Sequence, residues 1–275
     1  MYKRQTINGV PQPIRQAERL VSLPIVPGEQ QIELSWRSAD TVTTRWQTPA
    51  FDLGTDSVNA ALQVVVPGDR WVLAAGGPQL GPAVLFWGTL IVIVAVAGVL
   101  GRLKLAPVST LQWGLLGVGL TQTSVLSAVL IVGWLLALGV RNRVPAELPK
   151  WQFNLLQLAL AALTLTALSL LFEAIRQGLL GVPSMQIAGN GSTASELYWF
   201  QDRATANFPQ AWVVSVSIWF YRELMLAWAL WLAFALLGWL RWGWQHFARD
   251  GVWRRVNLLS GKSRVTVSEP PAPAA

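Results

Sequence analysis

Long apolar stretches that charged residues hardly enter dominate the chain from residue 83 onward. The clearest are residues 83–101, residues 125–140 with an upstream extension, residues 153–172 and residues 224–240. A helix on the surface of a soluble protein shows a polar face in every turn, and these stretches show none. Two of them come close to the roughly 20 apolar residues that cross about 30 Å of hydrocarbon. The pattern predicts an integral membrane protein, with a helical transmembrane bundle over residues 79–255.

Residues 105–140 are the ambiguous part of this pattern. The segment has 36 residues, which is about 54 Å of helix and too long for one crossing. Its middle holds the polar cluster Thr121-Gln122-Thr123-Ser124. Either an interfacial or re-entrant piece precedes a single span, or two short spans form a hairpin that turns at this cluster. The bundle therefore has four or five spans.

The distribution of Lys and Arg favours five spans, because cytoplasmic loops carry an excess of both. With five spans and residues 6–78 outside, these basic residues are cytoplasmic: Arg102, Lys104, Arg141, Arg143, Lys150, Arg241, Arg249, Arg254 and Arg255. Four spans with residues 6–78 inside misplace only Arg102 and Lys104, so that arrangement remains an alternative. We expect a multi-pass protein of the bacterial inner (cytoplasmic) membrane, with residues 6–78 in the periplasm and the C-terminus in the cytoplasm.

Residues 6–78 have the pattern of short β-strands. Residues 31–37 alternate, with Ile32, Leu34 and Trp36 on one face. Further strands are expected at residues 20–26, 41–46, 60–66 and 70–74, with Pro-Gly turns after residues 26 and 66. Such spacing is typical of an all-β sandwich. A segment of this size is small for a complete sandwich, so we expect a sandwich-like domain that is partial at its N-terminal side.

Three further segments complete the expected organisation. The opening residues 1–5, MYKRQ, look like the translation of a sequencing adapter and are set aside as an artefact. Residues 174–217 form a long periplasmic loop with an amphipathic piece at 174–180 and a strand at 213–217. This loop would leave apolar surface exposed if it were free, so we expect it to pack on the β-domain. Residues 256–275 have the composition of a disordered tail.

Composition agrees with the membrane class. Hydrophobic residues make up 53% of the chain and charged residues 13%. Many of the 16 Trp stand where an apolar run meets a polar one, as expected at the lipid headgroups. The net charge of +7 fits cytoplasmic membrane anchoring, since four Arg follow the last apolar run, and we expect no nucleic acid partner. The absence of Cys excludes disulfides, Cys-ligated zinc and Cys nucleophiles.

No motif for catalysis, a cofactor or a metal survives inspection. His246 is the single histidine and follows the last apolar run, where an interfacial role is the simpler interpretation. No Asp lies in a predicted span, which excludes intramembrane aspartyl chemistry. Ser260-Gly261-Lys262-Ser263 imitates the end of a P-loop, but Val256 occupies the position that must be Gly.

Polar residues at membrane depth are the remaining candidates. Arg222 and Glu223 stand at the start of the last span, and Glu173 ends the preceding span and is the expected partner of Arg222. Gln122 and Gln157 belong to a second set, with Asn154, Thr164 and Thr166. Hydrogen bonding between helices accounts for that set.

These observations favour a non-enzymatic component of envelope assembly, which anchors, scaffolds or regulates a polysaccharide or surface-protein system. One alternative is a transporter or channel subunit with Glu173, Arg222 and Glu223 near a substrate path. Another is the membrane anchor of an enzyme whose catalytic domain precedes this chain. The expected partners are the lipid bilayer and other envelope proteins.

Overall fold

The chain forms two compact units. The computed structural model describes residues 3–18, 20–37, 43–141, 143, 148–249 and 251–254. The first unit is Met1–Trp46 and the second is Gln47–Ala275. The β-structure expected over residues 6–78 is therefore divided, and its later strands belong to the same unit as the helices. The predicted tail at residues 256–275 lies outside the described residues.

The first unit contains two small antiparallel sheets. One has the order β2-β1-β5, formed by β1 (Lys3–Ile7), β2 (Val10–Gln12) and β5 (Ile32–Trp36). The other pairs β3 (Arg15–Ala17) with β4 (Leu20–Ser22). Asn8 and Gly9 join β1 to β2 with φ of 51° and 78°, which is the geometry of a two-residue type I′ hairpin turn. Residues 3–5, which were expected to be a sequencing artefact, lie in β1. The alternation predicted over residues 31–37 is present in β5.

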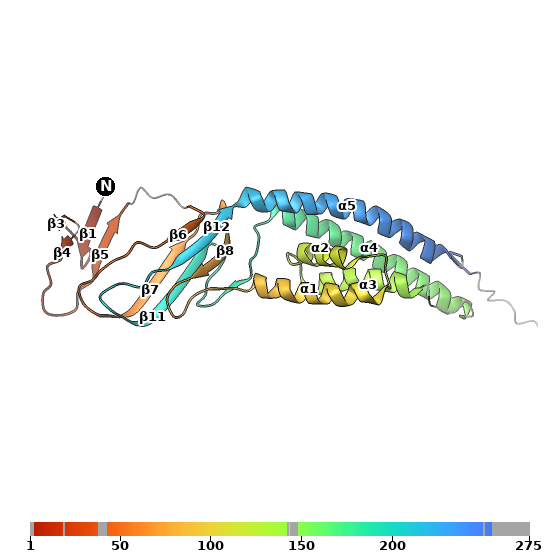
Figure 1. Ribbon diagram of the computed structural model, residues 1–275, viewed down its shortest axis with the longest axis horizontal. Helices are drawn as coiled ribbons and strands as arrows, with labels where there is room; N and C mark the ends of the chain where they lie inside the picture. Colours follow the sequence, from red (N-terminus) through yellow and green to blue (C-terminus); the bar gives the residue numbers. More distant parts are fainter. Residues whose placement is uncertain are drawn as a thin grey trace, which may run out of the picture. The chain divides into compact units, whose positions relative to one another are not determined.

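Strands from distant parts of the sequence pair in the second unit (Figure 1). β7 (Ser57–Val65) pairs with β11 (Glu196–Ala204), and β8 (Arg70–Gly76) pairs with β12 (Trp212–Ser217). β9 (Ala83–Val84) pairs with β10 (Ile187–Ala188), and β6 (Arg45–Gln47) lies at the division between the units. The prediction that the segment before the last helix packs on the β-structure is confirmed. The contact is closer than expected, because that segment supplies strands of its own.

A small apolar core joins these strand pairs. Along β11, Leu197 and Trp199 are buried while Tyr198 and Phe200 are half-buried, as the alternation of a strand requires. They pack with Val72 of β8 and Val213 of β12. Gly81 lies against the indole of Trp199, so that a Cβ at this position would overlap the ring. The glycine that precedes the first helix therefore lets the chain pass close to the core.

Five helices follow in the described part of the chain: α1 (Phe86–Leu103), α2 (Thr110–Leu120), α3 (Val125–Arg141), α4 (Lys150–Leu180) and α5 (Ile218–Ala248). Three of them, α1, α4 and α5, are long and apolar enough to cross a membrane. α3 is a shorter apolar helix of 17 residues, about 25 Å, and α2 has 11 residues, about 16 Å. The predicted break at residues 121–124 is confirmed, since α2 and α3 meet there.

The fourth helix is longer than the apolar run indicated. α4 continues to Leu180, so the piece at residues 174–180 is its last two turns and not part of a separate loop. No helix breaker stands between Glu173 and Leu180 except Gly178, and Gly178 lies against the methyl group of Met225 in α5. The first strong stop is Gly181, which begins the sequence Gly-Val-Pro.

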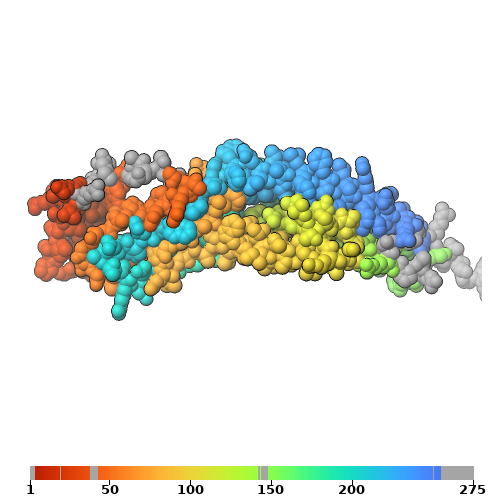
Figure 2. All heavy atoms as spheres, viewed as in Figure 1, coloured from red at the N-terminus to blue at the C-terminus, as the bar shows by residue number. Residues whose placement is uncertain are grey.

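Small residues allow the helices to approach closely at Gly117 and Gly119. A Cβ at Gly117 would overlap Ile93 of α1, and one at Gly119 would overlap the Trp228 indole of α5. α1 packs chiefly against α2 and leaves Ile91, Val94 and most of its other side chains exposed (Figure 2). In a membrane protein such an all-round apolar surface faces lipid or another helix.

The pairing of β7 with β11 can be tested with engineered cysteines, because the native chain has none. Gln63 and Tyr198 are opposite one another, and their side chains share a hydrogen bond of 3.1 Å. The double variant Gln63→Cys/Tyr198→Cys should form a disulfide under mild oxidation, seen as a shift in non-reducing electrophoresis. The matched control, Gln63→Cys/Asp202→Cys, moves one thiol about 13 Å along the strand, beyond disulfide reach, and should not cross-link. Equal cross-linking of both pairs would contradict this register.

Candidate functional site

The charged candidates at the end of α4 do not meet those at the start of α5. Glu173 accepts hydrogen bonds from Arg176 Nε at 2.7 Å and from Gln177 Nε2 at 2.8 Å, and it forms an ion pair with Arg176. The predicted pairing of Glu173 with Arg222 is therefore wrong. Residues three and four positions apart face each other on any helix, so a partner in the next turn is always within reach. A partner on another helix depends on how the two helices are rotated.

Arg222 lies one turn after Trp219 in α5. Its guanidinium carbon is 5.0 Å from the centroid of the Trp219 ring, within the range of a cation–π contact. The Nε atom is buried and has no hydrogen-bond partner among the described residues. Glu223 follows it on an exposed face. In the described part of the chain, Arg222 thus pairs one cation with one indole.

Gln122 holds the chain where it leaves α4. Its Oε1 accepts a hydrogen bond from Ser184 N at 3.1 Å, and its Nε2 donates to Ser184 O at 3.4 Å. The amide thus pairs with both the backbone N–H and the backbone C=O of Ser184, as a neighbouring β-strand would. Gln122 therefore ties the turn between α2 and α3 to the exit of α4.

Gln157 and Asn154 likewise tie α4 to the chain at the end of α5. The Nε2 of Gln157, a residue 2% exposed, donates to Phe247 O at 2.8 Å and to Gly251 O at 3.3 Å. Asn154 accepts from Arg254 N at 2.9 Å and donates to Arg254 O at 2.8 Å. The last carbonyls of a helix lack partners within the helix, and Gln157 supplies one for Phe247 O. Gly251 and Arg254 lie just beyond the end of α5, so these bonds also fix the chain that follows the helix. Gln157 of α4 thus bonds to a neighbouring helix, because its partner Phe247 lies in α5.

Two arginines at this end contact one aromatic ring, which sequence reasoning missed. The guanidinium carbons of Arg141 and Arg254 lie 5.1 Å and 3.9 Å from the centroid of Phe153. Arg141 is 3% exposed although it ends an apolar run. A basic residue in that position indicates membrane anchoring, and nothing in its spacing points to Phe153, so the sequence carried no usable signal.

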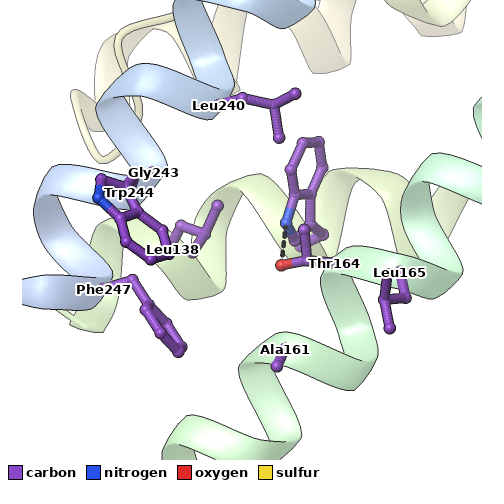
Figure 3. A pocket seen from close by; sticks show the side chains of 9 residues that line it. Leu138, Ala161, Thr164, Leu165, Leu240, Gly243, Trp244 and Phe247 are labelled. Atoms are coloured by element: carbon purple, nitrogen blue, oxygen red, sulfur yellow. Dashed lines mark hydrogen bonds between the residues drawn. The ribbon is translucent and has the colours of Figure 1, made fainter. Parts of the chain in front are cut away.

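An apolar cavity lies between α3, α4 and α5, with a volume of about 300 Å³ (Figure 3). Its walls are Trp134 and Leu138 of α3, Ala161, Thr164 and Leu165 of α4, and Leu240, Gly243, Trp244 and Phe247 of α5. Two polar side chains of its walls bond within the bundle, because Trp134 Nε1 donates to Thr164 Oγ1 at 3.0 Å and that hydroxyl donates to Leu160 O at 2.7 Å. The cavity is suited to an apolar ligand.

The strands and helices of the second unit are joined without a flexible connection. Ser217 ends β12, and α5 begins at Ile218, whose N–H donates to Asp69 O at 2.9 Å. Arg70 of β8 donates to Ser215 Oγ at 3.2 Å and to Ser215 O at 2.8 Å.

The first helix is fixed to the same strand pair. Trp87 of α1 donates from Nε1 to Leu73 O in β8 at 2.9 Å. The rings of Trp71 and Tyr221 meet edge to face at 5.2 Å between centroids. Both α1 and α5 are thus held at β8, where they enter the bundle.

The described residues contain no group of three or more His, Cys, Asp or Glu that could hold a metal ion. The features that stand out are the contacts that fix α1 and α5 to β8 and the apolar cavity. The fold is that of a membrane protein that carries β-sheets on a set of helices. Comparison with protein-family models, with curated proteins and with solved structures finds no match.

The amide of Gln157 can be tested by substitution. Gln157→Leu keeps the approximate volume but leaves the carbonyls of Phe247 and Gly251 without this donor. We expect a loss of about 1–3 kcal/mol in stability, measured as a lower denaturation midpoint in detergent. Gln245→Leu, at an exposed position of α5, is the matched control and should change stability by less than about 0.5 kcal/mol. Equal effects of the two substitutions would show that the contact with α5 does not contribute.

Proposed function

We propose that this chain is a non-enzymatic component of envelope assembly in the bacterial inner membrane, which presents a β module at a fixed orientation on its helices. The β module consists of β7, β8, β11 and β12. The observation that carries the proposal is the direct passage of β12 into α5, together with the bond from Ile218 N to Asp69 O. A scaffold or regulator needs this rigidity, because a binding surface on a flexible linker cannot transmit orientation to a partner.

Two further features support this role. The four strands come from both sides of helices α1–α4 in the sequence, so the β module cannot fold without the segment between α4 and α5. In addition, the polar candidates Glu173, Arg222, Gln122 and Gln157 each have a local or structural contact, and none of them lines the apolar cavity between α3, α4 and α5. That distribution favours a scaffold over a transporter or channel subunit, in which ionisable residues line a common path.

The proposal includes five membrane crossings, with the β module in the periplasm and the C-terminus in the cytoplasm. Contacts between α1 and α2 are antiparallel, since Gly101 lies against Thr110 and Gly117 against Ile93. The turn after α2 then reaches Ser184, three residues before β10, through Gln122. That contact supports a return of α2 to the side of the β module.

The shortness of α2 is the main difficulty for five crossings. Hydrogen bonds at both ends of the helix reduce this difficulty. Ser109 and Gln112 form a capping box at the N-terminus, and the hydroxyls of Thr121 and Thr123 donate to Val118 O and Leu120 O at the other end. Polar groups that are satisfied in this way can lie at membrane depth with little cost.

Reporter fusions test this topology. A reporter that is active only in the cytoplasm should be silent near Gln47, active after Lys104, silent after Ser124 and active after Arg255. The physical reason is the excess of Lys and Arg on the far side of the helices. Activity at both Gln47 and Arg255 would overturn the orientation, and activity after Ser124 would reduce α2 and α3 to a re-entrant segment.

The functional role can be tested by loosening the joint. A Gly-Ser-Gly-Ser insertion between Ser217 and Ile218 should leave the protein in the membrane but abolish its ability to restore detergent resistance in a bacterium that lacks the gene. The control is the same insertion between Asn190 and Gly191, a turn where a Cβ at Gly191 would meet nothing within 4 Å. Full complementation by the Ser217 insertion would refute the need for a rigid joint.

A further inference from the structure

The apolar cavity between α3, α4 and α5 is separate from the joint at the β module. We propose that it holds one acyl chain of an anionic phospholipid, with the lipid phosphate close to Arg241. Its volume of about 300 Å³ is at the lower end of the roughly 300–1,000 Å³ range of ligand cavities, which suits a single slender chain.

The walls select for hydrocarbon. Three wall residues carry a side-chain N–H or O–H: Trp134 bonds to Thr164, Thr164 bonds to Leu160 O, and Trp244 has its indole N–H on the exposed rim. A polar ligand would lose its hydrogen bonds to water inside this cavity and regain few of them, which costs free energy. An acyl chain loses nothing of that kind and gains contact with Leu138, Leu240 and Phe247.

Small residues create the space. Gly243 is buried, and a Cβ there would come within 3.0 Å of Leu138 Cδ1, so the backbone of α5 lies close to α3 at this point. On α4, Ala161 is exposed and offers only a methyl group to the opposite wall. A larger residue at either position would occupy the volume available to a ligand.

The cavity opens where a membrane lipid can enter it. Leu165 on α4 is 68% exposed and Trp244 on α5 is 63% exposed, and both line the cavity. α4 and α5 are two of the helices that are long and apolar enough to cross a membrane. The exposed rim of the cavity therefore faces the bilayer.

Charge and depth identify the kind of lipid. Arg241 stands one turn before Trp244 and is exposed, and Arg with Trp is typical of the headgroup level. The segments 141–150 and 241–255 contain Arg141, Arg143, Lys150, Arg241, Arg249, Arg254 and Arg255 against Glu147 and Asp250. This excess of positive charge attracts an anionic headgroup.

Photo-cross-linking of the full chain in nanodiscs tests the proposal. The probes are phosphatidylglycerol and phosphatidylcholine that carry a diazirine in one acyl chain, with adducts located by peptide mass spectrometry. We expect adducts concentrated at residues 161–165 and 240–247, with a higher yield for phosphatidylglycerol. Ala161→Phe should lower that yield about tenfold, because the ring takes the place of several methylene groups.

Matched variants separate the outcomes. Ala162→Phe adds the same ring at the neighbouring exposed position, outside the cavity, and should leave the yield unchanged. Arg241→Gln should remove the preference for phosphatidylglycerol but retain adducts at the same residues. Labelling of the native chain spread evenly over α1, α4 and α5 would refute a specific site, as would equal yields from Ala161→Phe and Ala162→Phe. Equal yields from the two lipids in the native chain would refute the assignment of an anionic headgroup.

Discussion

The structure depends on how backbone groups are satisfied where the chain leaves a helix in an apolar setting. Inside hydrocarbon, an unpaired N–H or C=O group costs several kcal/mol, and the last four carbonyls of every helix have no partner within it. Three side-chain amides satisfy backbone groups at or just beyond helix ends here. Gln122 bonds to both backbone groups of Ser184 after α4, Asn154 does the same for Arg254, and Gln157 bonds to the carbonyls at the end of α5. These amides thus satisfy backbone groups at the end of α5 and in the segments that follow α4 and α5.

The same reasoning explains the joint between strands and helices. β12 needs no turn before α5, because Ser217 caps the helix and Asp69 accepts the N–H of Ile218. α1 is held at the neighbouring strand through Trp87 and Leu73 O. Since both helices are anchored at β8, a displacement of that strand requires movement of α1 and α5.

The sequence predicted the positions of the helices better than the contacts between them. Apolar runs located α1, α3, α4 and α5, and the cluster Thr121–Ser124 located the break between α2 and α3, because long apolar segments and polar turns are local signals. The sequence also indicated that Val213 belongs to a strand that packs on the β-structure. The pairing of Glu173 was predicted wrongly, since the rotation of one helix against another is set by packing and leaves no trace in spacing. The hairpin at Asn8-Gly9 was overlooked although Asn-Gly is a strong turn signal.

The discontinuity of the β module has a consequence for biosynthesis. β7 is complete at Val65, but its partner β11 starts at Glu196, about 130 residues later. At about 5–20 residues per second, translation needs roughly 7–26 s to supply that partner. During this interval β7 and β8 have open edges on which other strands could assemble. The nascent chain must therefore keep two strands soluble while four helices are inserted, and a holdase acting on residues 57–76 would be of most use in that period.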